Sequence, residues 1–591
     1  MTPGLINRDA AASSWRGDAL AAVLLSSLLA ICWAIKDWPQ LAHLNLPDTD
    51  DMMRLAQVRD WVAGQAANDW TQHRLGPPGG APMHWSRIAD LGPAAIIIAA
   101  QSVLSAATAE RVAILTWPAL LFAVALFLIA RVARRIGPSS GASIALIVGA
   151  TAYPANSLFL PGRIDHHGLQ ICLVLGAVLA LARPPSRGSG IAAGGCAAAS
   201  FGIGLETAPQ IGALMGALFI LWVARGARES SRVTGFGLTL AGCTAGLLAF
   251  ARPTYWSPLW CDAFTPASST ATLAGGAVFV VLGLVVPALP RPAQRLTIGG
   301  GVAAAALAAA IALYPVCLTG PYGPMTPFLR GAMIDNIVEA RGLFAGPVSQ
   351  VVEFGVPAAG LMVIASIVAG VLWLKRPSRR MVMLPLIAAL AISDLVLLSQ
   401  LRAAYVGSAL TAPILAQLIL AAREHRSRLV LIGAWAISAG MLWLLVPMRI
   451  AAALAPQSGT ALAATRSCRS GDVWEQVDAV RTGTVMASAA NGAYVVGGTR
   501  HRSIGAGFHR NNAGNTAMYA FFLAAPGQAR SIGRRWSVDY VVFCPTDFSE
   551  LEVTRRWPTS LAATLAEGHP PPWLVSIPLR NTGLKLYRVE P

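Results

Sequence analysis

The residues best able to do chemistry in this chain occur in short polar segments between long apolar runs. Asp48, Asp50 and Asp51 form the first such group, and Arg54 follows them. Their carboxylates are hard oxygen ligands of the type that suits Mg²⁺ or Mn²⁺ bridging a phosphate. The alternative is a solvated acidic turn in which an aspartate caps the next helix. From this segment alone, both interpretations stay open.

A second polar group stands directly before an apolar run. Asp165, His166 and His167 are adjacent there, and aspartate and histidine are both metal ligands by type. The alternative is an interfacial turn whose histidines face water. A third polar segment holds Glu339, although a lone glutamate in a long loop is usually just solvated. Glu206, in a tight turn between two apolar runs, either faces the same space or only marks the turn.

Arg402 stands between two apolar runs, a position in which an arginine needs an anionic partner. The guanidinium fork matches phosphate oxygens, so the pyrophosphate of a lipid-linked substrate is one candidate. Asp394, about one to two helical turns earlier, is the structural alternative. A third is that the side chain snorkels to the lipid headgroups.

Polar and basic residues also gather near the C-terminus. His501 follows a β-like run, and His509 and Arg510 come a few residues later. Such patches bind anionic or sugar groups, and they also occur on ordinary protein surface. We predict substrate contacts by these three side chains, with plain surface as the alternative.

The elements that position these groups are apolar helices. The chain has 591 residues, of which 55% are hydrophobic and only 12% charged, and its mean hydropathy is +0.56. Soluble globular proteins carry roughly 25% charged residues, so most of this chain lies where charge is expensive. The net charge of +17 comes from arginines spread over short loops. That spacing indicates membrane topology and argues against a nucleic-acid partner.

Long apolar runs predict about thirteen transmembrane helices. They cover residues 19–35, 112–130, 142–158, 168–182, 190–204, 209–224, 233–251, 271–289, 296–316, 354–374, 381–398, 405–422 and 429–446. A further run at residues 92–107 is short and begins with Gly-Pro. If it does not cross, every arginine-rich loop faces the cytoplasm, as the positive-inside rule requires. We therefore place it along the outer interface.

This topology puts the acidic groups on one side of the membrane. The predicted transmembrane domain is residues 1–448, and its outer loops are residues 36–111, 159–167, 252–270 and 317–353. Outward-facing chemistry is therefore favoured.

The remaining residues, 449–591, are predicted to form a small extracytoplasmic α/β domain. Short β-like runs occur at residues 484–487, 493–496, 538–543 and 584–589. Cys468 and Cys544 lie in this domain, where they form either a disulfide or a free buried pair. The predicted fold class is thus an α-helical polytopic membrane protein with a small C-terminal α/β domain.

In their order, spacing and membrane side, these segments resemble the catalytic subunits of oligosaccharyltransferases, within the GT-C class of polyprenyl-linked glycosyltransferases. The features that carry the resemblance are the Asp-rich first loop with Arg54, the Pro/Gly stretch 77–85 with its His84, Asp165-His166-His167, Glu339, Arg402, and about thirteen helices before an outer soluble domain. Archaeal members of the family also have Asp-His-His as the second motif.

The resemblance implies a role for each residue. The implied metal ligands for Mg²⁺ or Mn²⁺ are Asp48, Asp50, Asp165 and His167. The implied catalytic residues are Asp48, Asp50, Asp165 and Glu339. The implied substrate contacts are Arg402, Arg54 and His84, in addition to His501, His509 and Arg510 predicted above from the basic patch. Which of Asp48, Asp50 and Asp51 binds the cation stays open, because different alignments favour different ones.

One departure from the family concerns the acceptor. The family's soluble domain carries a Trp-Trp-Asp motif that reads the acceptor sequon, and the matching stretch here, residues 485–492, lacks it. The resemblance therefore implies another acceptor: a lipid, a glycan or a different protein site.

The function expected on this basis is metal-assisted transfer of a sugar or oligosaccharide from a polyprenyl-(pyro)phosphate donor. The expected location is a bacterial inner membrane, with the C-terminal domain periplasmic. One alternative is a polyprenyl-phosphate monosaccharide transferase that modifies lipopolysaccharide or a cell-wall glycan. The second is a component of a membrane transporter, which would place acidic residues near the bilayer midplane.

Overall fold

Apolar helices make up most of the molecule, as the sequence predicts. The computed structural model describes residues 6–251, 260–320, 322–323, 325–454, 467–469 and 471–590, with side chains from residue 15. The helices of the membrane part are α1 (Ile6–Leu41), α2 (Thr49–Val62), α3 (Leu91–Gln101), α4 (Ala106–Ile136), α5 (Gly141–Ala150), α6 (His167–Ala182), α7 (Arg187–Ile203), α8 (Ala208–Arg225), α9 (Ser230–Phe250), α10 (Pro266–Val285), α11 (Pro292–Leu313), α12 (Pro327–Met333), α13 (Val348–Gln350), α14 (Val356–Lys375), α15 (Arg380–Leu397), α16 (Ala403–Glu424), α17 (Arg428–Ser438) and α18 (Gly440–Leu454).

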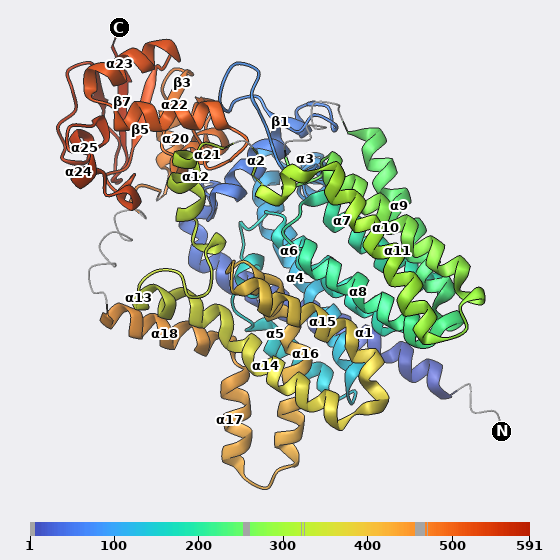
Figure 1. Ribbon diagram of the computed structural model, residues 1–591. Coiled ribbons are helices and arrows are strands. Elements are labelled where there is room, and N and C mark those ends of the chain that lie inside the picture. The colour runs from blue at the N-terminus through green and yellow to red at the C-terminus, as the bar shows by residue number, and fades with distance from the viewer. Residues whose placement is uncertain are drawn as a thin grey trace.

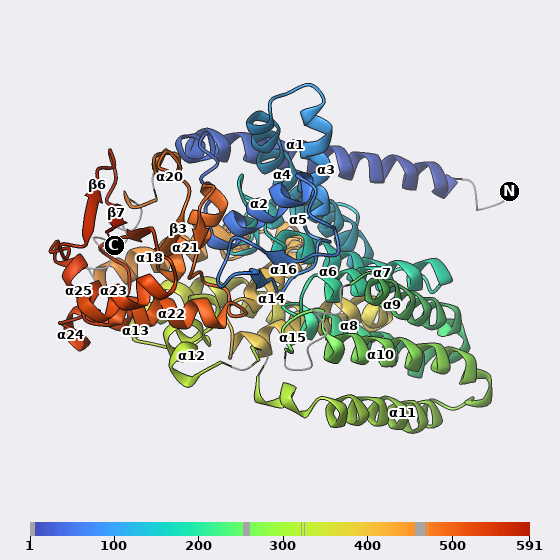
Figure 2. The same cartoon turned by 90° about the horizontal axis from the view of Figure 1, so that it is seen from above.

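This is a multi-pass membrane protein. Within the described part of the chain, eight helical segments are long and apolar enough to cross a membrane, or nine if one bent pair counts as a span. Each predicted apolar run contains a helix, and several of these helices are shorter than a full span. The C-terminal domain lies at one end of the helices and the N-terminus at the other, in both views of the molecule (Figures 1 and 2).

The span predicted at residues 429–446 is broken into two helices. Helices α17 and α18 meet at Ala439 with a bend of 74°, and Figure 1 shows them running in different directions. Gly440 lies against the backbone of Thr151 and Tyr153, where a side chain would collide. The absence of a Cβ therefore allows α18 to turn away along this contact.

The short run after Asp90 forms α3, which packs on α4. With 11 residues it is about 16 Å long, roughly half of a hydrocarbon core. Gly92 sits directly under the ring of Trp117, so the two helices approach closely. Its length agrees with the prediction that residues 92–107 do not cross the membrane.

The C-terminal part contains a five-stranded sheet with the order β4-β3-β5-β7-β6. Its strands are β3 (Thr484–Ala487), β4 (Arg502–Ser503), β5 (Tyr540–Phe543), β6 (Leu574–Ile577) and β7 (Lys585–Val589), and its helices are α20 (Val473–Asp478), α21 (Ala489–Gly498), α22 (Asn512–Leu523), α23 (Pro526–Arg535), α24 (Val553–Arg556) and α25 (Leu561–Ala566). Strand β3 is parallel to β4 and β5, whereas β7 is antiparallel to β5 and β6. A small hairpin of β1 (Thr71–Gln72) and β2 (Ala81–Pro82) lies in the first long loop.

Three of the predicted β-like runs are strands, and the prediction of a strand at residues 493–496 is wrong. That segment lies inside α21. Ser488 caps this helix by accepting a hydrogen bond from the backbone of Asn491. A short apolar run that is buried all round has no periodicity to separate strand from helix, and the cap decides for helix.

Helix α21 also joins the C-terminal domain to the first loop. Gly497 lies against the backbone of Met52 on α2, and the Tyr494 hydroxyl donates to the Leu46 carbonyl at 3.1 Å. Met52 and Tyr494 belong to the same apolar core as Trp474. The domain thus fixes the position of α2, whose first turn carries the aspartates.

Two disulfides hold the same end of the molecule. Cys468 and Cys544 are bonded, which decides between the two alternatives left by the sequence. A second bond, Cys261–Cys317, was not predicted and links the segment before α10 to the segment after α11.

Replacing Cys261 and Cys317 together by serine is expected to lower the free energy of unfolding by about 2–4 kcal/mol, because the unfolded chain gains a long open loop. Thermal unfolding in detergent measures the loss. Cys32 and Cys243 are free and exposed, so their double serine variant is the matched control. Equal midpoints for the two variants would contradict a structural role for this bond.

Candidate functional site

A cavity of about 1060 Å³ lies where the helices of the membrane part meet the C-terminal domain. The predicted site residues that line it are Asp48, Asp50, His84, Asp165, His167, Glu339, Arg402 and His509. Further charged residues on its walls are Arg163, Glu206, Asp262, Asp547 and Glu550. Folding therefore brings the eight predicted residues together from six separated parts of the sequence.

The first turn of α2 presents aspartates that are used differently. Asp48 caps the helix by accepting from the Asp50 backbone at 3.2 Å, and its other oxygen pairs with Arg163 at 2.8 Å. Asp51 is fully buried. It pairs with Arg163 at 2.9 Å and accepts from the Asp165 backbone at 2.9 Å. Asp51 therefore positions the loop that carries Asp165.

Asp50 is the aspartate left available. Its side chain lines the cavity and makes no hydrogen bond or ion pair with any described residue. Burial, together with the nearby carboxylates of Asp165, Asp48 and Glu339, raises the pKa of Asp50 well above its usual range. A cation bound among these groups would offset that repulsion.

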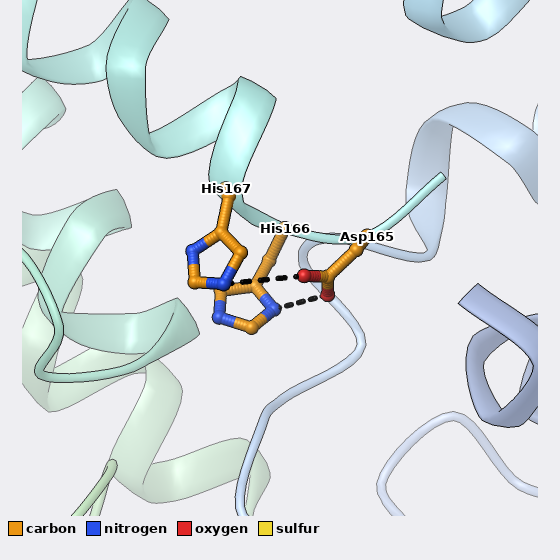
Figure 3. Close-up of side chains that lie close together, drawn as sticks. All are labelled: Asp165, His166 and His167. Carbon is orange, nitrogen blue, oxygen red and sulfur yellow. Dashed lines mark hydrogen bonds and ion pairs between the residues drawn. The ribbon is translucent and has the colours of Figure 1, made fainter. Parts of the chain in front are cut away.

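Asp165, His166 and His167 converge at the start of α6, and Figure 3 shows both imidazoles beside the carboxylate. Asp165 Oδ1 lies 2.5 Å from His166 Nδ1, and Oδ2 lies 3.4 Å from His167 Nε2. One ligand atom from each residue lies within 4.8 Å of the others. Burial alone would raise the pKa of Asp165, but His166, His167 and Arg54 hold it well below its usual range. Asp165 therefore stays ionised, as a metal ligand requires.

Arg54 supports this carboxylate from behind the cavity wall. Its guanidinium donates to Asp90 at 2.7 Å and to Asp165 at 3.3 Å, and it stacks over the Trp85 ring at 4.4 Å. Arg54 and Asp90 are both fully buried. The predicted substrate contact by Arg54 finds no support, because the side chain does not line the cavity.

His166 and Glu206 form a pair for which the sequence assigned no chemistry. His166 Nε2 lies 3.4 Å from Glu206 Oε1, and Gln170 donates to the other oxygen at 3.2 Å. Burial opposes the charge on His166, but Asp165 and Glu206 outweigh it and raise its pKa to about 10. His166 is therefore a buried cation that holds two carboxylates. The one signal in the sequence was the tight turn containing Glu206.

Glu339 and Arg402 meet on another wall of the cavity. Arg402 lies 3.6 Å from the Glu339 carboxylate, and the Tyr405 hydroxyl donates to the same carboxylate at 2.6 Å. Asp394, the structural alternative, instead accepts a hydrogen bond from Ser366 at 2.5 Å. Arg402 and Glu339 both face the cavity. At 3.6 Å, Arg402 neutralises the charge of Glu339 only in part.

Of the three predicted residues in the basic patch of the C-terminal domain, His501, His509 and Arg510, only His509 lines the cavity. His501 does not line the cavity, because Nδ1 accepts from the Gly483 backbone and Nε2 donates to the Val477 carbonyl, each at 3.0 Å. Arg510 forms an ion pair with Asp262 at 2.7 Å, and its guanidinium lies over the Trp260 ring. Both are structural contacts, so the predicted substrate roles of His501 and Arg510 find no support. His84 and His509 remain on the wall.

The chemistry of the donor set fits a divalent cation. Asp165 Oδ2 is buried and accepts no hydrogen bond, and the Asp50 side chain is unpartnered among the described residues. Two carboxylates and a nearby imidazole are a ligand set for Mg²⁺ or Mn²⁺. Asp165 and His167 contribute ligand atoms that lie close together, and Asp48 and Asp50 line the same cavity.

No family model matches the sequence, and no curated protein is similar to it in sequence. Among solved structures, the chain is similar to the Archaeoglobus fulgidus oligosaccharyltransferase AglB in complex with an inhibitory peptide and a dolichol-phosphate, with a TM-score of 0.64 and 15% identity over 94% of this chain and 72% of that one. It is also similar to the same organism's enzyme tethered with an acceptor peptide containing the NVT sequon (TM-score 0.61, 14% identity, 97% and 74% covered). A third similar structure is the complex with Zn and sulfate (TM-score 0.60, 14% identity, 96% and 73% covered).

Proposed function

We propose that this chain is a membrane glycosyltransferase that moves a sugar or oligosaccharide from a polyprenyl-(pyro)phosphate donor to an acceptor, with a divalent cation. Its fold is that of an oligosaccharyltransferase-like GT-C membrane protein, remote in sequence. The observation that carries the proposal is the convergence of Asp50, Asp165, Glu339 and Arg402 on one cavity. Charged groups with perturbed pKa values that gather on one cavity are typical of functional sites.

In this proposal the residues that line the cavity have separate roles in binding the substrates and the cation. Arg402 binds the phosphate oxygens with its guanidinium fork. Asp50, Asp165 and His167 hold the cation, and the bound cation would neutralise charge on the leaving phosphate. Glu339, aligned by the Tyr405 hydroxyl, accepts a hydrogen bond from a substrate hydroxyl or completes the metal shell.

Two observations support an extracytoplasmic site in a bacterial inner membrane. The bonds Cys261–Cys317 and Cys468–Cys544 both belong to the cavity end of the molecule, and disulfides persist in oxidising compartments. The arginine-rich loops predicted to face the cytoplasm include Arg131 and Arg134, which pair with Asp18 near the N-terminus. The cavity would then open on the periplasmic side, and the C-terminal domain would be periplasmic.

The decisive experiment uses the purified protein with radiolabelled lipid-linked sugars extracted from the source's own membranes. We expect sugar release with Mn²⁺ or Mg²⁺, loss of release with EDTA, and recovery when the cation is added back. Heat-denatured protein is the control. Release that EDTA does not change would contradict the cation, and no release at all would contradict the function. The mass added to the acceptor separates a block from a single sugar.

A further inference from the structure

A second pair of titratable groups lies on the cavity wall, away from the carboxylate cluster. His509 Nε2 lies 2.5 Å from Asp262 Oδ2. Asp262 directly follows Cys261, and the Cys261–Cys317 disulfide restrains this segment. Both side chains are more than nine-tenths buried and both line the cavity. The cation-binding residues proposed above do not include either of them.

The geometry sets the tautomer of His509. Arg510 donates to both oxygens of Asp262, at 2.7 and 3.2 Å, which keeps that carboxylate ionised. An ionised carboxylate only accepts, so His509 Nε2 carries a hydrogen, and the lone pair of the neutral imidazole is then on Nδ1. Nδ1 makes no hydrogen bond with any described residue. This arrangement, a carboxylate that orients an imidazole whose other nitrogen is free, is that of a general base.

The position of the pair suits a reaction partner that approaches from a different wall than the cation. The His84 ring lies 5.0 Å from the His509 ring and 4.3 Å from the Trp85 ring, tilted against both, and the Trp85 ring lies 5.6 Å from the His166 ring. These rings separate His509 from the carboxylate cluster. In a displacement at an anomeric carbon, the group that takes the acceptor proton and the group that stabilises the leaving phosphate belong on opposite faces of the sugar.

We propose that His509, oriented by Asp262, is the general base of the transfer and that the acceptor is therefore a hydroxyl group. This inference rests on the proposed function. The acceptor O–H proton passes to His509 Nδ1 as the oxygen bonds to the anomeric carbon. The bond from that carbon to the phosphate oxygen breaks, and the polyprenyl (pyro)phosphate leaves with its electron pair. Asp262 stabilises the imidazolium, which returns its proton to water or to the departing phosphate.

The composition and contacts of residues 485–492 also favour a hydroxyl acceptor. Residues 485–492 contain neither tryptophan nor aspartate, and Ser488 and Asn491 instead bind Asp547, at 2.9 and 3.0 Å. An asparagine amide is a poor nucleophile whose activation is not a simple proton removal, whereas a sugar or lipid hydroxyl needs a base.

The test measures turnover of the same lipid-linked sugar extract with water as the acceptor, since a general base also deprotonates water. His509→Gln keeps an amide N–H near the Nε2 position, so the tie to Asp262 survives, but it cannot take a proton. We expect kcat to fall about 10²-fold or more with KM for the donor within about threefold. Asp262→Asn, a positioning variant, should also lower kcat, because an amide can favour the wrong tautomer.

Three comparisons keep the test decisive. His73 pairs with Asp69 at 2.9 Å outside the cavity, so His73→Gln is the matched control and should keep wild-type kcat. His509→Ala should be rescued by added imidazole, which a purely structural contact would not allow. The groups facing His509 are Asp262, His84, Tyr322 and Arg510, and a pH profile of kcat should lose its lower limb in His509→Gln.

The outcomes are separable. If wild-type protein releases no sugar, the proposed function fails. If it does, but His509→Gln retains kcat within twofold or imidazole rescues nothing, the general base is wrong. The linkage formed in the source's own membranes gives the second readout: sugar on oxygen supports a hydroxyl acceptor, and sugar on nitrogen overturns it.

Discussion

Replacing Asp50 and Asp165 together by asparagine is expected to lower cation-dependent sugar transfer by about 10³-fold or more. Asparagine keeps the shape of each side chain but removes the negative charges that hold the cation, and charge stabilisation of this kind is worth several kcal/mol in a transition state. The measurement is the initial rate of sugar release from the lipid-linked extract across a series of Mn²⁺ concentrations.

The single variants rank the aspartates that the sequence left equivalent. Asp48 and the buried Asp51 are both already paired with Arg163. Asp50→Asn should therefore raise the Mn²⁺ concentration for half-maximal rate more than Asp48→Asn does. Asp37 pairs only with exposed Lys36, and Asp37→Asn is the control. A double variant with wild-type rate, or a larger effect for Asp48, would place the cation elsewhere.

Topology explains why part of the site was predictable. Asp48, Asp165, Glu339 and Arg402 lie far apart in sequence, but each stands in a polar segment between two apolar runs. Charge bias assigns all those segments to one side of the membrane. One cavity lined by all four follows from that sidedness, and the order of the segments carried the family resemblance. The fold similarity to AglB agrees with that resemblance.

Contacts between distant segments explain what the sequence could not give. Asp262 and His509 are separated by 247 residues, and no periodicity brings two such residues together. His501 and His509 have similar surroundings in the sequence, yet one is sealed inside the domain and the other lines the cavity. Arg54 also follows the aspartates in the pattern of a substrate contact. Only the packing of α2 shows that it faces inward, away from the cavity.

Removing Arg54 is expected to have the largest effect on stability. Arg54→Met removes the shorter of the two ion pairs of the fully buried Asp90, leaving Arg87 at 3.1 Å, and takes a donor from Asp165. Breaking a buried ion pair from one side costs about 3–5 kcal/mol, and we expect the lower end of that range because Arg87 still compensates part of the charge on Asp90. Unfolding in detergent, followed by denaturant titration, measures the change. Arg59, on the same helix, pairs with Glu110 while partly exposed, and Arg59→Met should cost at most about 1 kcal/mol.

The same variant links stability to the cation. Without Arg54, the Asp165 carboxylate carries more uncompensated charge, so Mn²⁺ should stabilise Arg54→Met more than it stabilises the wild-type protein. If Mn²⁺ shifts the unfolding midpoints of wild type and variant equally, Arg54 and the cation do not share Asp165, and the cation site must lie closer to Asp48 and Glu339.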